Sequence, residues 1–449
     1  MGTQYYEGSQ HRYRDYLLSD VLQMLGRACR PAEDERSRAV LMTPATKKNY
    51  YLKFINEALP IESYLQLWLH DAFVTEVSTK TIENKQDAVD WLTWTFFYRR
   101  LVQNPSFYGL QGTSHSELSD FLSDLVETTL AELTDAKILA IEDEMDILPM
   151  NQAMIAAYYN ITWTTLQTFT LSLTSKTKLK GLLEIVTSAA EYEDLPIRKH
   201  EDVVLRRVYD RVPVKLSEPS YESPHFKAFV LLQAHFSRLT LPPDLVTDQT
   251  LVLSKVLNLL SACVDVMSSE GWLNAFGAME LSQMVVQAMW DRDSPLKQVP
   301  HFNNDIIKRC GEAGIESVFD LMEMEDDQRT ELLHMTPNQL AAVAGFVNKY
   351  PNIDINFEVE DPESIVAKSP AFLKVELERD IDEDEDVDTT VHAPFYPGKK
   401  MENCNVFLSN KLMAGWFVVS SAKELVSIKR VTFSRKLSVR LNFTVPVAG

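Results

Sequence analysis

The spacing of apolar residues changes once along this chain, near residue 351, and that change sets the fold class. Before it, apolar residues recur at helical intervals. After it they alternate with polar residues, in runs such as "NIDINFEVED", "AFLKVELERD", "GWFVVSS", "LVSIKRVTF" and "KLSVRLNFTV". A period of two is typical of antiparallel strands. The sequence therefore predicts a multidomain, mainly α protein with a C-terminal all-β domain of the sandwich type in residues 351–449.

The mainly helical part divides into four segments. Residues 1–50 are interpreted as a strand–helix–strand piece of an α/β domain. Residues 51–150 hold helices, a capping box from Ser114 to Glu117 and an alternating hairpin "ILAIEDEMDILPMN", an order that suggests a winged helix. Residues 151–300 predict a helical bundle and residues 301–350 a pair of helical hairpins. The acidic run of residues 380–388 is expected to be a solvated loop, with an acidic docking segment as the alternative.

Charge and cysteine content narrow the function classes. The 449 residues carry a formal net charge of −20. This disfavours general polyanion binding, which depends on neutralising phosphates, and suits protein partners. The four cysteines show no CxxC pairing, so neither a zinc site nor a disulfide framework is expected. The polar start is no signal peptide and no apolar run of membrane-spanning length is expected, so we predict the cytosol or nucleus, with no membrane contact.

An arginine motif lies near the start of the chain, in "QMLGRACRP". Arg27 and Arg30 are three residues apart, and guanidinium groups at this spacing on a helix could neutralise charge on a nucleotide γ-phosphate. Gly26 would allow close backbone packing, and Gln23 could position water. The alternative is the start of a basic amphipathic helix.

No complete catalytic site accompanies this motif. The phosphate-binding pattern G-x-x-x-x-G-K-[ST] does not occur in the sequence. Residues 143–146 spell D-E-x-D, but they lie in the predicted hairpin and after the arginine motif, so they are interpreted as an acidic wing turn. The chain alone is therefore predicted not to be an enzyme and to hold no metal or cofactor.

Two further segments are candidate nucleic-acid contacts. The predicted helix of residues 278–290, "AMELSQMVVQAMW", carries an apolar stripe on one face. Gln283, Gln287 and Trp290 lie on another face and could contact bases, unless the helix is simply buried and its tryptophan packs. Gly311 and Gly314 permit a tight turn between two helices, where free amides could bind phosphate. The neighbouring glutamates favour a purely structural hairpin instead.

Together these segments resemble a known family. "DVLQMLGRACRP" resembles the sixth motif of the Ski-two-like RNA helicases of superfamily two, Q-x-x-G-R-A-G-R-P. The stretches "FINEALPIES", "TIENKQDAVDWLTWTFFYRRLVQNPSFYGL", "SAAEYEDLPIRKHED", "GWLNAFGAMELSQMVVQAMW" and "PHFNNDIIKRC" resemble their Sec-63 homology region. The likeness covers nearly the whole chain. It is strongest to the C-terminal cassette of the spliceosomal members.

The resemblance implies an architecture and roles. It implies the tail of a second RecA-like domain, a winged helix, a helical ratchet bundle, a helix–hairpin–helix unit and an immunoglobulin-like sandwich. Arg27 and Arg30 would face the γ-phosphate of ATP, held with magnesium by the parent helicase, with Gln23 beside them. Gln283, Gln287 and Trp290 would grip single-stranded RNA. Implied partners are spliceosomal proteins, small nuclear RNA and the first helicase cassette of the parent, in the nucleus.

Three departures from the family pattern qualify these expectations. Cys29 replaces the family's glycine, which suggests a weakened motif and a regulatory, protein-docking role. The motor residues that precede the motif in the family are missing. Residues 401–413, without strand alternation, interrupt the predicted sandwich, which also lacks its end, so we expect a fragment with a gene-model error. The alternatives are the equivalent region of the ASC-one complex helicase, a stand-alone scaffold and an ATPase with a divergent nucleotide site.

Overall fold

The computed structural model describes residues 1–30, 32–57, 61–364, 366, 368–380, 389–398, 400, 404–409, 413–414, 417–418 and 425–445. The acidic run at 381–388, much of "GWFVVSS" and Pro31 of the arginine motif lie outside these residues. The chain forms two compact units. The first comprises Met1–Thr168, Thr187–Arg211 and Lys215–Val230, and the second comprises Phe169–Val186, Val212–Val214 and Leu231–Gly449. Each unit takes segments from separate parts of the sequence.

The N-terminal segment of the first unit is a hairpin followed by helices. Strand β1 (Gln4–Glu7) pairs antiparallel with β2 (Arg12–Asp15), and helices α1 (Leu18–Gly26) and α2 (Lys48–Asn56) follow. After α1, the apolar run "RAVLMT" (residues 38–43) forms one parallel bridge, between Gly2 and Met42. Val40 and Met42 are 56% and 66% exposed. The predicted strand–helix–strand order is therefore not found: a hairpin precedes α1, and the apolar run after it forms a single bridge.

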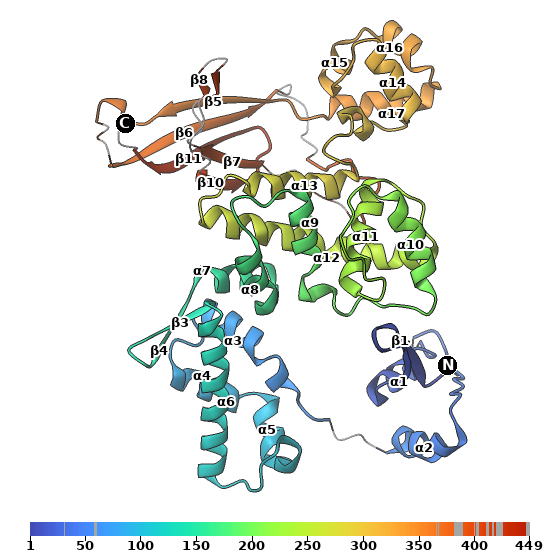
Figure 1. Cartoon of the computed structure of the whole chain (residues 1–449), viewed down its shortest axis with the longest axis vertical. Helices are drawn as coiled ribbons and strands as arrows, with labels where there is room; N and C mark the ends of the chain where they lie inside the picture. The colour runs from blue at the N-terminus through green and yellow to red at the C-terminus, as the bar shows by residue number, and fades with distance from the viewer. Residues whose placement is uncertain are drawn as a thin grey trace. The chain divides into compact units, whose positions relative to one another are not determined.

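A helical group with a two-stranded wing follows in the first unit. Its elements are α3 (Leu69–Ser78), α4 (Lys85–Thr93), α5 (Phe96–Gln103), α6 (His115–Asp135), β3 (Leu139–Glu142) and β4 (Asp146–Pro149) (Figure 1). The predicted capping box is confirmed: Ser114 and Glu117 cap each other's amides at the start of α6. The hairpin is confirmed too, with Leu139 and Ile147 buried.

Helices fill most of the chain from residue 151 to 300. They are α7 (Asn151–Tyr159), α8 (Trp163–Ser172), α9 (Leu179–Thr187), α10 (Glu201–Arg211), α11 (Pro224–Phe236), α12 (Pro243–Ser269) and α13 (Ala275–Gln287). By length and composition alone α12 could cross a membrane, so the expectation that no apolar run reaches that length was wrong. Its most apolar stretch is 56% buried inside the protein, which is typical of a core helix.

Four short helices form a small domain of their own in the second unit. They are α14 (Asn304–Glu312), α15 (Val318–Glu323), α16 (Asp326–Leu333) and α17 (Pro337–Asn348), grouped together in Figure 1. They surround one hydrophobic cluster that includes Ile306, Cys310, Leu321 and Val343. This agrees with the predicted pair of helical hairpins.

The C-terminal part is built of strands, as the alternating pattern predicted. Strands β5 (Ile353–Val359), β6 (Pro370–Arg379) and β11 (Lys436–Thr444) form an antiparallel sheet in the order β11-β6-β5. A second sheet pairs β7 (Cys404–Ser409) with β10 (Leu425–Val431), and β8 (Met413–Ala414) pairs with β9 (Phe417–Val418). Val406 and Val431 of the second sheet pack against buried Val375, Leu377 and Val439 of the first.

Strand β7 corrects one expectation. It lies within residues 401–413, where no strand was predicted, and it pairs with β10 from Cys404 to Ser409. Backbone pairing with a neighbour can place a segment in a sheet even where its side chains do not alternate. The part of residues 401–413 that the structure describes is therefore integrated in the β domain.

Candidate functional site

The arginine motif lies at the exposed end of α1. The helix ends at Gly26, and the amide of Arg27 donates to the carbonyl of Gln23 at 3.2 Å. Arg30 lies beyond the helix end, so Arg27 and Arg30 do not share a helical face as predicted. A Cβ on Gly26 would meet no atom within 4 Å, so the close packing expected there is not found either.

Arg30 is paired with acidic neighbours. Its Nη1 lies 2.6 Å from Glu33 Oε2, and its Nε lies 3.9 Å from Asp34 Oδ2. The Arg30 side chain is 73% exposed, so these pairs contribute little to stability. The guanidinium is therefore held loosely by its neighbours and remains accessible to an anionic ligand. Gln23 and Arg27 are exposed as well.

Helix α13 has the two faces that its sequence predicted. The apolar stripe is buried, with Leu281, Met284, Val285 and Ala288 each at most 4% exposed. Gln283 is exposed and Gln287 is half-buried. The two amides therefore lie on the side of the helix that can reach a ligand.

The C-terminal end of the helix differs from the prediction. Helix α13 stops at Gln287 because Ala288 takes a left-handed conformation, with φ of 49°. Trp290 lies beyond this turn and is 6% exposed. Its ring centroid is 5.1 Å from that of Phe236, and its Nε1 donates to Ser237 Oγ at 2.9 Å. The helix was predicted to extend to residue 290, which was wrong. The helical spacing of apolar residues does not show that the backbone leaves the helix at Ala288.

A different aromatic residue is exposed on this helix. Phe276 is 46% exposed. It precedes Glu280, Gln283 and Gln287 at intervals of four, three and four residues, which places all four on one side of α13. The same periodicity could have identified it from the sequence, had the helix start been set at Ala275.

A histidine holds the inner side of α13. His235 Nε2 donates to the carbonyl of Val285 at 2.7 Å. Burial lowers the pKa of His235, although the Val285 carbonyl acts in the opposite direction. The imidazole is thus favoured in its neutral form, with the proton on Nε2. It fixes the inner face of α13 without adding charge.

The glycine pair at the end of α14 forms a structural turn. Gly314 has φ of 81°, and the Ile315 amide donates to the Cys310 carbonyl at 2.8 Å. Gly311 lies inside α14. These contacts support the structural interpretation of the two glycines.

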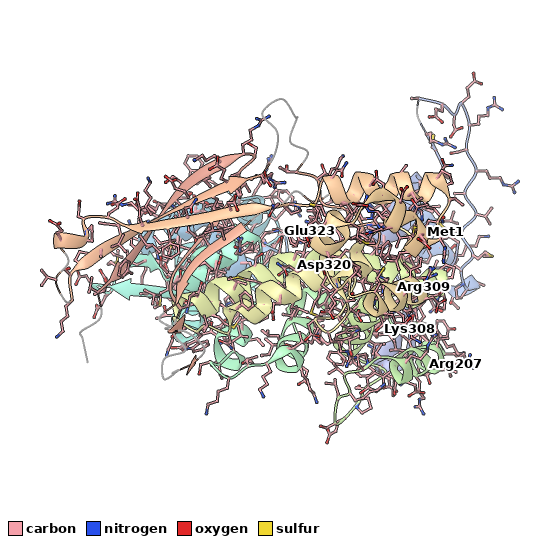
Figure 2. All side chains as sticks on the ribbon, turned by 90° about the horizontal axis from the view of Figure 1, so that it is seen from above. Met1, Arg207, Lys308, Arg309, Asp320 and Glu323 are labelled. Carbon is pink, nitrogen blue, oxygen red and sulfur yellow. The ribbon has the colours of Figure 1, made fainter. Side chains whose placement is uncertain are left out.

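The amides that could have bound phosphate at this turn already have an acceptor. Asp320 Oδ2 lies 2.9 Å from the Glu316 amide and 2.8 Å from the Ser317 amide. These bonds hold the pKa of Asp320 below its usual range. Figure 2 labels Asp320 and Glu323 of α15 and Lys308 and Arg309 of α14, so this small domain carries charges of both signs.

The first three residues of the D-E-x-D sequence form the turn between β3 and β4, and Asp146 begins β4. Asp143 and Glu144 have φ of 49° and 62°. This left-handed pair belongs to a tight hairpin turn, which confirms the wing interpretation. Within the described residues, no group of three or more histidine, cysteine or acidic side chains could hold a metal ion.

The chain matches two families of known proteins. Residues 149–449 match the Sec63 Brl domain, and residues 62–143 match the winged helix-turn-helix domain. The pre-mRNA-splicing factor brr2 of Schizosaccharomyces pombe is 56% identical over 451 residues. The U5 small nuclear ribonucleoprotein 200 kDa helicase of Homo sapiens is 51% identical over 453 residues. The DExH-box ATP-dependent RNA helicase DExH12 of Arabidopsis thaliana is 49% identical over 452 residues.

These alignments cover 100%, 100% and 99% of the chain but 20% of each relative. The chain therefore spans about one fifth of the length of the curated relatives that it matches. The match to the Sec63 Brl domain extends over more than half of the chain, from α7 to the C-terminal strands, and the winged helix-turn-helix match includes α3 to α6 and β3. The chain belongs to the Sec63 Brl domain family, joined to a winged helix-turn-helix domain.

Proposed function

We propose that this chain is the C-terminal Sec63-type region of a spliceosomal ATP-dependent RNA helicase, and that it grips RNA and docks proteins. The observation that carries the proposal is identity of 51–56% across the whole chain to proteins named as a splicing factor and a ribonucleoprotein helicase. The proposed partners are spliceosomal proteins, small nuclear RNA and the first helicase cassette of the parent, in the nucleus. The net charge of −20 suits the protein partners.

The finer domain assignment is part of the same proposal. Residues 1–50 would be the tail of a second RecA-like domain, 51–150 the winged helix, and 151–300 the ratchet bundle. Residues 301–350 would be the helix–hairpin–helix unit and residues 351–449 an immunoglobulin-like sandwich. The two β sheets that share a core support the last assignment.

ATP and magnesium would be held by the parent, outside this chain. Arg27 and Arg30 would then reach the γ-phosphate from the end of α1, where both are exposed. The chain alone is expected to show no RNA-stimulated ATP hydrolysis, because its sequence has no phosphate-binding loop. Turnover by the purified chain that Arg27→Ala abolishes would contradict this.

The RNA contact would be the exposed side of α13. Gln283 and Gln287 would hydrogen-bond bases or backbone, and Phe276 would offer a stacking surface. In the described conformation the buried indole of Trp290 would support the grip from the end of the helix. Stacking of one base on an aromatic ring is worth about 1–3 kcal/mol, or roughly five- to 150-fold in affinity.

Fluorescence anisotropy with single-stranded RNA tests this surface. We expect Phe276→Ala and the double variant Gln283→Ala/Gln287→Ala each to weaken binding by about tenfold. Gln328→Ala is the matched control, since Gln328 is an exposed glutamine on α16. Equal affinities for all these variants would place the RNA contact elsewhere.

A further inference from the structure

Helices α11 and α13 both end, within the second unit, in left-handed residues that are not glycine, as α16 does at His334. Arg238, after α11, and Ala288, after α13, both have φ of 49°. At α11 the Leu239 amide donates to the Ala234 carbonyl at 2.9 Å and the Arg238 amide to the His235 carbonyl at 3.0 Å. Glycine is the usual residue at this position, because it takes the left-handed conformation without strain. At α11 an arginine takes this position, and its side chain makes specific contacts with the end of α13.

The Arg238 side chain caps the end of α13. Its Nε donates to the Ala288 carbonyl at 2.9 Å, and its Nη2 donates to the carbonyls of Gln287 and Lys297 at 3.1 Å each. The last carbonyls of a helix lack partners within the helix and carry partial negative charge, so a guanidinium satisfies both needs. Arg238 thus joins the end of α11 to the end of α13 and to the turn that leads into α14.

An aromatic ring from the C-terminal part covers the same guanidinium. Arg238 Cζ lies 4.3 Å from the centroid of Phe395. The segment that carries this ring, residues 389–398, is anchored on both sides of it. The Tyr396 hydroxyl donates to the Leu253 carbonyl of α12 at 3.0 Å. The His392 ring lies 5.3 Å from the ring of Phe346 in α17.

We propose that residues 389–398 act as a clasp that positions the end of α13 through Arg238. Phe395 holds the guanidinium in the orientation that caps the carbonyls of Gln287 and Ala288. A protein bound to the β domain would then change the end of α13 by moving the clasp. The effect of the clasp on RNA binding rests on the proposed function, in which α13 grips RNA. The contact between the clasp and the end of α13 does not depend on that function.

The contacts predict graded effects. A cation–π contact at a partly exposed site is worth about a two- to fivefold change in an equilibrium constant, and Phe395 is half exposed. Hydrogen bonds to a charged group are worth tenfold or more. Removing the ring should therefore loosen the end of α13 less than removing the guanidinium.

Amide hydrogen exchange on the full 449-residue chain tests the clasp. We expect exchange at residues 286–290 to rise about threefold in Phe395→Ala and at least tenfold in Arg238→Met. Phe357→Ala is the matched control, because Phe357 is a 74% exposed phenylalanine on β5. Amides in α6 serve as a reference for the fold, and Arg238→Lys provides a milder variant should Arg238→Met fold poorly. Unchanged exchange at residues 286–290 in Phe395→Ala would overturn the clasp.

RNA binding separates the clasp from the proposed function. We expect Phe395→Ala to weaken binding of single-stranded RNA about threefold, with Phe357→Ala unchanged. If exchange rises but neither Phe395→Ala nor Gln283→Ala/Gln287→Ala affects RNA affinity, the clasp stands and the RNA role of α13 fails. If only the glutamine variant weakens binding, the RNA role stands and the coupling from the clasp to the grip is wrong.

Discussion

At the residue scale, one glutamate joins the loop before α3 to helix α5. Glu62 accepts two hydrogen bonds from Arg100, with Nη2 at 2.7 Å and Nε at 3.1 Å. Asn104 Nδ2 and the Tyr108 hydroxyl donate to the same carboxylate at 2.8 and 3.1 Å. These donors, Arg100 foremost, hold the pKa of Glu62 at about 2. The ionised form is therefore favoured by folding.

This lowered pKa predicts a pH dependence of stability. The ordinary pKa of a glutamate is about 4.3, so the contribution of Glu62 is complete above that pH and is lost as the pH falls towards about 2. We expect Glu62→Gln to lower the thermal unfolding midpoint at pH 7 and to flatten its decline between pH 4.5 and 2. Circular dichroism at a series of pH values measures both effects.

A surface glutamate provides the comparison for Glu62. Glu57 lies 4.0 Å from Lys53 Nζ, with 62% of its side chain exposed, so Glu57→Gln should leave the unfolding midpoint nearly unchanged. If the Glu62→Gln curve ran parallel to that of the unaltered chain below pH 4.5, the ionisation of Glu62 would not be linked to folding.

Local periodicity identified some of these residues and missed others. The buried stripe of α13 was predictable because its members repeat at helical spacing. Glu62 and Arg100 were not, since a hydrogen-bonded pair 38 residues apart leaves no local pattern. Trp290 lies after a left-handed turn that the sequence around Ala288 does not mark with glycine.

At the element scale, side-chain caps define several helix starts. Capping boxes begin α6 at Ser114, α15 at Ser317 and α17 at Thr336. Each satisfies amides that the first turn of a helix would otherwise leave without partners. These boundaries are fixed by residues close in sequence, which is why the one at Ser114 could be predicted.

The cap of α6 predicts a specific loss of stability. Ser114→Ala removes the hydroxyl that accepts from the Glu117 amide, and we expect the free energy of unfolding to fall by about 1 kcal/mol. Ser116→Ala, two residues further along the same helix, should change it by less than about 0.5 kcal/mol. Urea titration of both variants provides the measurement. Equal losses would show that the cap adds nothing.

The break between α4 and α5 shows the limit of periodicity. Apolar residues at helical spacing run through both helices, yet the chain turns at Thr95, whose hydroxyl accepts from the Tyr98 amide. Phe97 is buried as a result, whereas Phe96 is 52% exposed. A helix cap inside an apolar run thus changes which aromatic side chain faces the core. The spacing of apolar residues alone does not reveal such a cap.

At the scale of the whole molecule, segments distant in sequence complete the second unit. Asn274 Nδ2, before α13, donates to the carbonyls of Thr174 and Thr177 at 2.8 and 3.1 Å. Leu182 of α9 lies so near Gly277 that a Cβ there would be 3.5 Å from its Cδ1. The order of helical and β domains was predictable from the change of period, but this interleaving was not, because it depends on contacts between distant segments.

Because the second unit includes residues from before position 231, we expect a chain that begins at residue 231 to be less stable than the complete unit. A chain of residues 231–449 lacks α9 and the first half of α11, so it exposes the apolar surfaces that these two segments cover. We expect it to unfold at a lower temperature and to aggregate more readily than a chain of residues 169–449. Differential scanning calorimetry and light scattering provide the measurement. Identical unfolding midpoints would show that α9 is not needed.

The same contacts between Asn274 and Thr174 impose an order on synthesis. One hundred residues separate these partners. At a synthesis rate of roughly 5–20 residues per second, a ribosome needs about 5–20 s to add these one hundred residues. During that interval the apolar side of α9 emerges without α13 to cover it. The nascent chain therefore exposes an apolar surface of α9 to which a chaperone could bind. Helix α13 covers this surface only after it has been synthesised.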